Sequence, residues 1–182
     1  TGRNIWIAAT YFYLHNHFPL MQIDVSCDSH SDGISVMHYD DVSFRVVHPS
    51  HFIVVVQPDR ATDHYGHVRV VQNRRIASDD HVFIPFWPQP DLWRREPDRG
   101  DRFERLGFLG TVNNCAPCLR SEVFLNELRK LGPTFVMRDE WRDYRDLDAV
   151  VAVRDLTPWD AQRKPATKLV NSWMAGVVPV LG

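Results

Sequence analysis

The most constraining feature of the sequence is a set of short, continuous apolar runs that end abruptly in polar residues. The clearest is residues 52–56 (FIVVV), which is rich in β-branched side chains and is stopped by residues 57–59 (QPD). Runs without strict alternation favour strands that are covered on both faces, as in parallel sheets. The sequence therefore indicates an α/β fold.

The same pattern predicts the remaining elements along the chain. We expect further strands at residues 5–9, 34–37, 68–71, 82–84, 106–109, 134–137, 148–153 and 177–182. We expect helices at about residues 11–17, 119–131 and 165–175, the last two ending at Gly132 and Gly176.

The elements form two α/β series separated by a segment of different composition. Residues 86–102 combine prolines with Phe86, Trp87 and Trp93, which is typical of a linker with aromatic anchors. We therefore expect a first domain at residues 1–85, a linker at 86–102 and a second domain at 103–182. The chain starts without methionine and ends directly after a strand, so we expect a fragment with an incomplete C-terminal domain.

Composition excludes several functional classes. The net charge of −2 and the pI of about 6.5 argue against a broad basic surface for nucleic acid. The 3 cysteines show no disulfide pattern, which favours a reducing compartment. There is neither a signal segment nor an apolar run near 18 residues. We therefore expect a soluble, cytoplasmic protein.

Two strand ends in the second series carry residues suited to an anion. Gly110 permits a tight turn and a close approach of the main chain, and Thr111 follows as a polar donor. Arg154 follows another strand and offers two-point binding of a phosphate or carboxylate. The alternatives are an ordinary turn glycine and a surface ion pair with Asp155.

A third feature is the start of the last helix, residues 164–168 (KPATK). Proline at the first helical position leaves the next backbone amides free, and Lys164, Thr167 and Lys168 add charge and a donor. The pattern fits a diphosphate site. It also fits a solvated helix start in which the lysines serve solubility.

These residues carry a resemblance to a known family. Residues 164–173 (KPATKLVNSW) with 175–177 (AGV) and 179–181 (PVL) resemble the donor-binding segment of GT-B-type glycosyltransferases. Residues 86–90 (FWPQP), 108–110 (FLG) and 152–155 (AVRD) look like further pieces of a bacterial group of that class. The resemblance covers residues 81–182, and before that only residues 37–41 (MHYDD) fit a loop of the acceptor-side domain.

The resemblance implies two Rossmann-like domains, with a nucleotide-diphosphate sugar held mainly by the second. The acceptor would be a glycan, a lipid or a small molecule, and a lipid acceptor would bring the enzyme to a membrane surface. No metal, separate cofactor or nucleic acid is implied. The residues expected to bind the donor are Gly110, Thr111, Arg154, Lys164, Thr167, Lys168 and Asn171. His38, Asp40 and Asp41 are the candidates for the catalytic base, and a purely structural strand-end loop is the alternative.

The sequence departs from the broader family at one place. Retaining members often carry two glutamates eight positions apart around this helix, whereas alignment on Pro179 places Lys164 and Ser172 there. The resemblance therefore does not carry over the donor-sugar contacts or the stereochemical outcome. A non-catalytic nucleotide- or carbohydrate-binding domain is the alternative function. A dehydrogenase or epimerase is disfavoured because no G-x-G-x-x-G follows a first strand.

The histidines and cysteines suggest metal or redox chemistry only weakly. All 9 histidines lie in the first half, without the spacing of a zinc site, so we expect scattered surface histidines. Cys115 and Cys118 form a CxxC without a second ligand pair nearby, and we do not expect redox activity from them.

Overall fold

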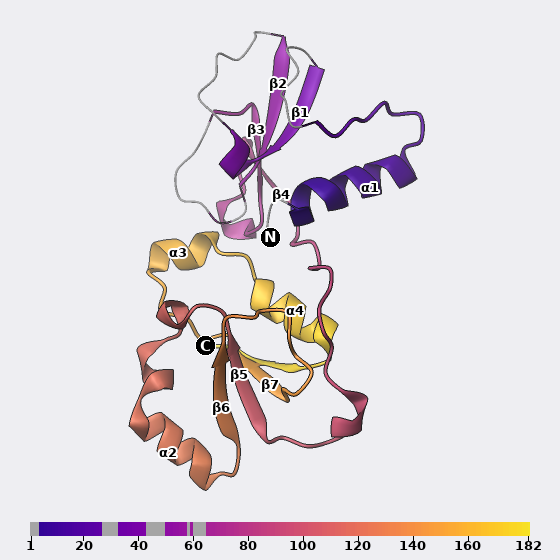
Figure 1. The fold of residues 1–182 in the computed structure, drawn as a ribbon. Helices are drawn as coiled ribbons and strands as arrows, with labels where there is room; N and C mark the ends of the chain where they lie inside the picture. Colours follow the sequence, from indigo (N-terminus) through magenta and orange to yellow (C-terminus); the bar gives the residue numbers. More distant parts are fainter. Residues whose placement is uncertain (1–3, 27–32, 43–49, 58, 60–64) are drawn as a thin grey trace. The chain divides into compact units, whose positions relative to one another are not determined.

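The chain divides into two compact units, each of which is described by itself. The computed structural model describes residues 4–26, 33–42, 50–57, 59 and 65–182 (Figure 1). Unit 1 comprises Thr1–Trp87 and Pro158–Pro165, and unit 2 comprises Pro88–Thr157 and Ala166–Gly182. The first change of unit falls between Trp87 and Pro88, beside the predicted start of the linker. That residues 158–165 belong to unit 1 was not predicted.

Unit 1 is built on a parallel four-stranded sheet with the sequential order β1-β2-β3-β4. Its strands are β1 (Gly33–His38), β2 (His51–Val56), β3 (Val68–Val71) and β4 (His81–Phe83). Its helical segments are η1 (Asn4–Ala8), α1 (Ala9–His17), η2 (Tyr39–Asp41), η3 (Arg74–Ile76) and α3 (Pro158–Arg163).

Two apolar clusters form the core of unit 1, and they contain different strand residues. Trp6 packs with Val56 and Val70 in one cluster, and Ile53 packs with Val55 in the other. The β-branched run of residues 52–56 supplies both clusters because successive strand residues point to opposite faces of a sheet. The prediction that this run is buried on both faces is confirmed for Ile53, Val55 and Val56.

Unit 2 contains a second parallel sheet, with the order β6-β5-β7-β8. Its strands are β5 (Arg105–Leu109), β6 (Thr134–Arg138), β7 (Ala149–Val151) and β8 (Val178–Val180). Its helical segments are η4 (Pro97–Arg99), η5 (Val112–Asn114), η6 (Pro117–Arg120), α2 (Glu122–Lys130) and α4 (Thr167–Ala175). Two parallel-strand sheets with helices make the protein α/β, consistent with Rossmann-like folds.

The helices of unit 2 begin and end where local chemistry dictates. The Ser121 hydroxyl accepts a hydrogen bond from the Phe124 amide at 3.2 Å and so starts α2, a few residues after the predicted start. Gly176 ends α4 in the left-handed region (φ +75°), as the sequence predicts.

The prediction of a strand at residues 5–9 is wrong. These residues form the π-helical turn η1 and the start of α1, with Ile5 and Trp6 buried. A short apolar run cannot be assigned to strand or helix by pattern alone, and no turn residue separates this run from the helix that follows. None of the described helices is long and apolar enough to cross a bilayer.

Candidate functional site

The order of the strands in unit 2 defines where a ligand can bind. The chain passes from β5 to β6 on one side and then returns to β7 on the other side of β5. In open parallel sheets, ligands bind outside the carboxyl ends of the strands at such a change of direction. A ligand is therefore expected beside the residues that follow β5 and β7, which include Gly110 and Arg154.

Gly110 directly follows β5 and requires the absence of a side chain. Its φ of +130° is strained for other residues, and a Cβ there would lie 3.2 Å from the Lys168 Nζ. The Gly110 amide donates to the Arg138 carbonyl at 2.7 Å, which fixes the turn. Thr111 comes next and is exposed. The absence of a side chain at Gly110 thus leaves room for the Lys168 ammonium, and the close approach of a ligand to the main chain here stays a prediction.

Arg154 follows β7 and is held at the same edge of the sheet. An isolated antiparallel bridge joins it to Cys115, and the Asp155 amide donates to the Asn114 carbonyl at 3.4 Å. The Arg154 Nε is buried and makes no hydrogen bond to any described residue. No ion pair joins Arg154 to Asp155 among the described contacts, so the alternative of an ordinary surface pair finds no support.

Lys168 lies in the first turn of α4, and its side chain extends to Gly110 at the end of β5. Its Nζ is 4.3 Å from the centre of the Phe108 ring, and Phe108 is completely buried in β5. Burial first, and then repulsion by Arg154, lower the pKa of Lys168 to about 8. No carboxylate among the described residues pairs with this ammonium. The ammonium and the Arg154 guanidinium therefore form a pair of like charges for which the described residues supply no counter-ion.

The N-terminus of α4 adds a third source of positive potential. Ala166 is its N-cap, no side chain caps it, and its first turn holds no acidic residue. Thr167 is half-buried in this turn. Gly110, Arg154, Lys168 and the α4 amides thus converge at one edge of unit 2, and we call this set the cation site.

Two predicted donor-binding residues have other surroundings. Lys164 belongs to unit 1, where its Nζ forms an ion pair with Asp59 at 2.8 Å. Asn171 is buried, and its Nδ2 donates to the Gln89 Oε1. The lysine charge is thus already compensated, and the asparagine ties α4 to the segment after Trp87.

His38, Asp40 and Asp41 lie at the carboxyl end of β1 in unit 1. His38 is the last residue of β1 and is buried, whereas Asp40 and Asp41 are exposed in η2. The His38 Nδ1 accepts the Asp40 amide at 3.3 Å, and the same nitrogen lies 3.6 Å from the Asp40 Oδ2. The three candidates for a base therefore lie together, with the imidazole oriented by the turn that follows it.

The sequence prediction missed two buried polar residues at the same edge. Gln57 directly follows β2 and Gln72 directly follows β3, and both are buried. Neither Gln72 amide atom has a hydrogen-bond partner among the described residues. The available signal was a glutamine placed immediately after a run of valines. His38, Gln57 and Gln72 thus lie at the carboxyl ends of three neighbouring strands.

The expectation of scattered surface histidines is wrong for His38 and His51, which are buried. The His51 Nε2 lies 2.7 Å from the Ser35 Oγ, and the His67 Nδ1 accepts the Ile53 amide at 3.0 Å. The His51 and His67 rings are thus hydrogen-bonded to the strands β1 and β2, respectively. Within the described ranges, no three His, Cys, Asp or Glu side chains are grouped to hold a metal ion. His30, His48, His64 and Cys27 lie outside the described residues.

The CxxC has one buried and one exposed thiol. Cys115 is buried and Cys118 is exposed, and both are free. Burial raises the pKa of the Cys115 thiol, which disfavours the reactive thiolate. Cys115 contributes to the cation site through its backbone bridge to Arg154 rather than through its sulfur.

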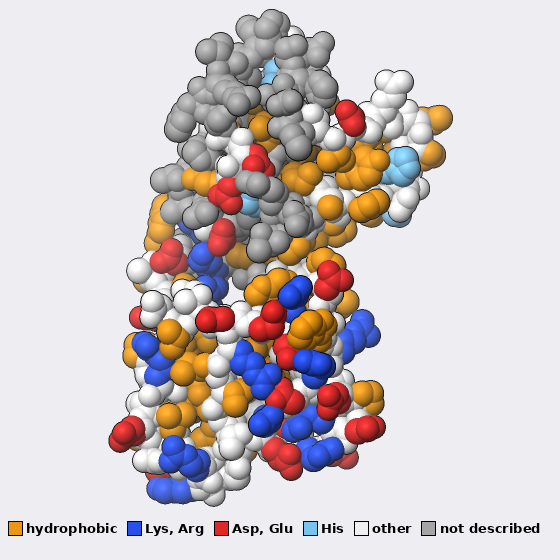
Figure 2. All heavy atoms as spheres, viewed as in Figure 1, with side chains coloured by type: hydrophobic (Ala, Val, Ile, Leu, Met, Phe, Trp, Pro, Cys, Tyr) orange, Lys and Arg blue, Asp and Glu red, His pale blue; other side chains and the backbone are white. Residues whose placement is uncertain are grey.

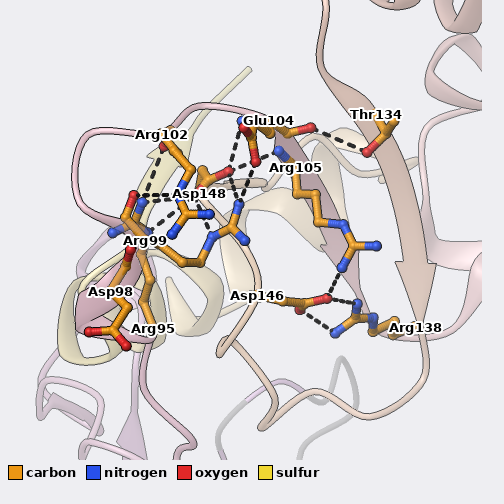
Figure 3. A network of polar contacts seen from close by, with 10 residues as sticks. All are labelled: Arg95, Asp98, Arg99, Arg102, Glu104, Arg105, Thr134, Arg138, Asp146 and Asp148. Carbon is orange, nitrogen blue, oxygen red and sulfur yellow. Dashed lines mark hydrogen bonds and ion pairs between the residues drawn. The ribbon is translucent and has the colours of Figure 1, made fainter.

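A second polar network lies at the amino ends of β5 and β7 (Figure 3). The Asp148 side chain is 1% exposed and accepts hydrogen bonds from Arg95, Arg99 and the backbone amides of Glu104 and Arg105. The donor–acceptor distances of these hydrogen bonds lie between 2.7 and 3.3 Å. The network attaches the segment before β5 to the start of β7, so its role is structural.

Comparison with known proteins adds no assignment. No protein-family model matches the chain, and no curated protein or solved structure is significantly similar to it.

Proposed function

We propose that the protein is a glycosyltransferase that moves a sugar from a nucleotide-diphosphate donor to an acceptor hydroxyl. The single observation that carries the proposal is the cation site, in which Lys168 and Arg154 lie together, partly buried and without a carboxylate partner among the described residues. Two like charges are unfavourable in such surroundings unless an anion binds there.

The chemistry of the cation site matches a diphosphate. A diphosphate carries several negative charges on adjacent phosphates, and the uncapped α4 amides, Lys168 and Arg154 supply matching positive groups. Gly110 lets the ligand approach the main chain after β5. The resemblance of residues 164–181 to a donor-binding segment points to the same ligand class.

The proposed reaction uses these groups to stabilise the leaving group. The acceptor oxygen attacks the anomeric carbon, the bond from that carbon to the diphosphate oxygen breaks, and the acceptor proton passes to a base. Negative charge develops on the departing diphosphate, where Lys168, Arg154 and the helix amides stabilise it. His38 is the proposed base, with Asp40 and Asp41 beside it.

The chain offers a matched set of lysines for the test. Lys130, Lys164 and Lys168 are its lysines: the first lies on exposed α2, the second pairs with Asp59, and the third belongs to the cation site. We expect Lys168→Ala to weaken the binding of nucleoside diphosphates by about 1–3 kcal/mol, the range for a lost charged hydrogen bond. Calorimetric titration of the full chain with a panel of nucleoside diphosphates measures the change.

The controls separate this site from general electrostatics. Lys130→Ala should leave the dissociation constant unchanged. The dissociation constant of Lys164→Ala tests whether Lys164 leaves its ion pair with Asp59 when the donor binds. An unchanged constant means that Lys164 keeps this ion pair, and a raised constant means that it contacts the donor. If no nucleoside diphosphate binds to the unmodified chain, the proposal fails.

A second function, a nucleotide-binding domain without catalysis, is favoured by one observation. Ser172 occupies a position where the broader family often has a glutamate, and it is completely buried with its hydroxyl donating to the Lys168 carbonyl at 2.6 Å. The Ser172 hydroxyl therefore forms a hydrogen bond within α4 and is not exposed to contact a sugar. This alternative holds if nucleotide binds at the cation site but neither transfer nor hydrolysis of any nucleotide sugar is detected.

A further inference from the structure

The segment from α1 to Val25, residues 9–25, exposes large apolar side chains, and we call it the α1 segment. None of the residues of α1 is buried. Phe12 is 61% exposed and Leu20 is 98% exposed, and Tyr13, Phe18, Met21 and Val25 are also exposed. Figure 1 shows α1 projecting from the strands of unit 1, and Figure 2 shows hydrophobic side chains gathered along it.

The base of this segment is firmly attached to unit 1. Trp6, just before α1, is buried with Val56 and Val70 in the core. The Trp6 ring meets the Trp87 ring edge-on at 6.3 Å, and Tyr13 lies 5.6 Å from Trp87. The N-terminal part of the α1 segment is therefore anchored to the core of unit 1 through Trp6 and Tyr13.

The α1 segment carries a single Asp, Glu, Lys or Arg side chain, that of Asp24 near its end. No Asp, Glu, Lys or Arg occurs from Asn4 to Ile23, although 24% of the chain is charged. Its polar groups are mainly hydroxyls and imidazoles on rings: Tyr13 stacks on His17 at 4.2 Å, and Tyr11 stacks on His15 at 5.7 Å. Rings with an apolar body and a polar edge are the groups that favour the boundary between lipid and water.

We infer that the α1 segment binds the surface of a phospholipid bilayer, with Phe12, Phe18, Leu20 and Met21 inserted among the lipids. A helix of nine residues is about 14 Å long at about 1.5 Å per residue, whereas a bilayer core is about 30 Å thick. The helix is therefore too short to span the bilayer, and the inferred contact is with the bilayer surface alone.

Two observations favour lipid over a protein partner. The exposed side chains continue from the helix onto Leu20, Met21 and Val25, where the chain has no regular structure, so they do not form the single stripe that a protein groove recognises. With Asp24 as its only Asp, Glu, Lys or Arg, the segment also offers few of the charges that fix the orientation of a protein complex. A fluid lipid surface requires neither a stripe nor such charges, and zwitterionic lipid suffices because no Lys or Arg takes part.

The inference does not rest on the proposed transferase activity, since vesicle binding is measured without a nucleotide. Failure of one leaves the other standing. If both hold, the enzyme works on an acceptor at a membrane surface.

The test is co-sedimentation of the full chain with phosphatidylcholine vesicles. The double variant Phe12→Ser/Leu20→Ser removes two exposed side chains of the α1 segment. The matched control is Val123→Ser/Leu131→Ser, which removes two similarly exposed side chains of unit 2. All four side chains are exposed, and circular dichroism and the thermal unfolding midpoint verify that both variants fold. We expect the unmodified chain and the control to sediment, and the α1 variant to partition at least tenfold less.

Several results would overturn the inference. One is no sedimentation of the unmodified chain, and another is equal loss in both double variants. Binding only to anionic vesicles, abolished by salt, would show an electrostatic contact elsewhere. Self-association that Phe12→Ser/Leu20→Ser abolishes would show that a second copy of the chain covers the segment.

Discussion

At the scale of single residues, Lys168 shows how a binding function opposes stability. Its ammonium is partly buried beside Arg154 without a counter-ion among the described residues, so the unliganded protein bears the cost of desolvation and repulsion. A methionine has a similar length and no charge.

We expect Lys168→Met to stabilise the unliganded protein by about 0.5–2 kcal/mol and to weaken the binding of nucleoside diphosphates. Thermal unfolding and calorimetric titration measure the two effects, and Lys130→Met on the exposed face of α2 is the control. A variant that gains no stability would mean that Lys168 is already compensated in the unliganded protein.

The lowered pKa of Lys168 also predicts a dependence on pH. Because the pKa is about 8 in the folded chain and about 10.4 when unfolded, the folded state loses this proton first, so the free energy of unfolding rises with pH between these values. Anion binding needs the protonated form. We expect nucleoside diphosphate affinity to fall about tenfold between pH 7 and pH 9.5, and Lys168→Arg to remove most of this dependence. If the affinity of Lys168→Arg falls between these two pH values by the same factor as that of the unmodified chain, Lys168 is not the group that titrates.

Residues of the cation site were predictable from sequence where the signal is local. Gly110, Arg154 and Lys168 each follow a strand or a proline at a helix start, and such positions can be recognised in the chain itself. Phe108 could not be assigned this way, because its role depends on the Lys168 ammonium that lies next to its ring in the folded protein. Lys164 has the same local signal as Lys168, and only the fold shows that it pairs with Asp59.

At the scale of elements, Asp148 determines how β5 and β7 are joined to the preceding segment. Burial alone would raise the pKa of Asp148, but hydrogen bonds from Arg99, the Glu104 amide and Arg95 hold it well below its usual value. Asp148 therefore contributes stability above pH 4, and this contribution is lost as the pH falls further, since the unfolded carboxyl titrates near pH 4.

We expect Asp148→Asn to lower the free energy of unfolding at pH 7 by about 3–5 kcal/mol, because it leaves two arginines without their buried partner. The difference from the unmodified chain should narrow toward pH 3. Urea unfolding at both pH values measures it. Glu140→Gln, which alters an exposed pair with Arg142, should not move the urea midpoint at pH 7.

The assignment of residues 86–102 as a linker stays a prediction, and the residues of this segment from Pro88 onward belong to unit 2. Residues 86–102 were predicted as a linker from their prolines and aromatic residues. Arg95 and Arg99 were not assigned a role, because their carboxylate partner lies about fifty positions later in the chain. A charge run indicates a solvated surface by default, and only tertiary structure shows which of its members are buried.

At the scale of the whole molecule, the two units have separate cores. Unit 2 contains two apolar clusters of its own, formed around Phe108 and around Leu147. Unit 1 has its own clusters around Trp6 and Ile53. The sequence pattern predicted two α/β series because each has its own strands. It could not predict that Pro158–Pro165 belongs to unit 1, since nothing local marks α3 as part of a distant domain.

We expect a fragment of residues 88–182 to fold by itself and to bind nucleoside diphosphates within about threefold of the affinity of the full chain. It contains the strands β5 to β8 and the residues of the cation site, and the contacts that it loses include those of α3 with η3, the hydrogen bonds from Asn73 and the ion pair of Lys164 with Asp59. Urea unfolding followed by circular dichroism, with titration of the same fragment, provides the test. A fragment without a cooperative transition would show that the two cores are not independent.

Because Pro158–Pro165 belong to unit 1, this unit cannot be completed until late in synthesis. Asn73 donates hydrogen bonds to the carbonyls of Ala161 and Lys164, so unit 1 contains an element that is synthesised long after its sheet. During translation, the strands β1 to β4 emerge first and then wait while residues 88–157 are added. Unit 1 therefore reaches its complete form only when most of unit 2 has left the ribosome.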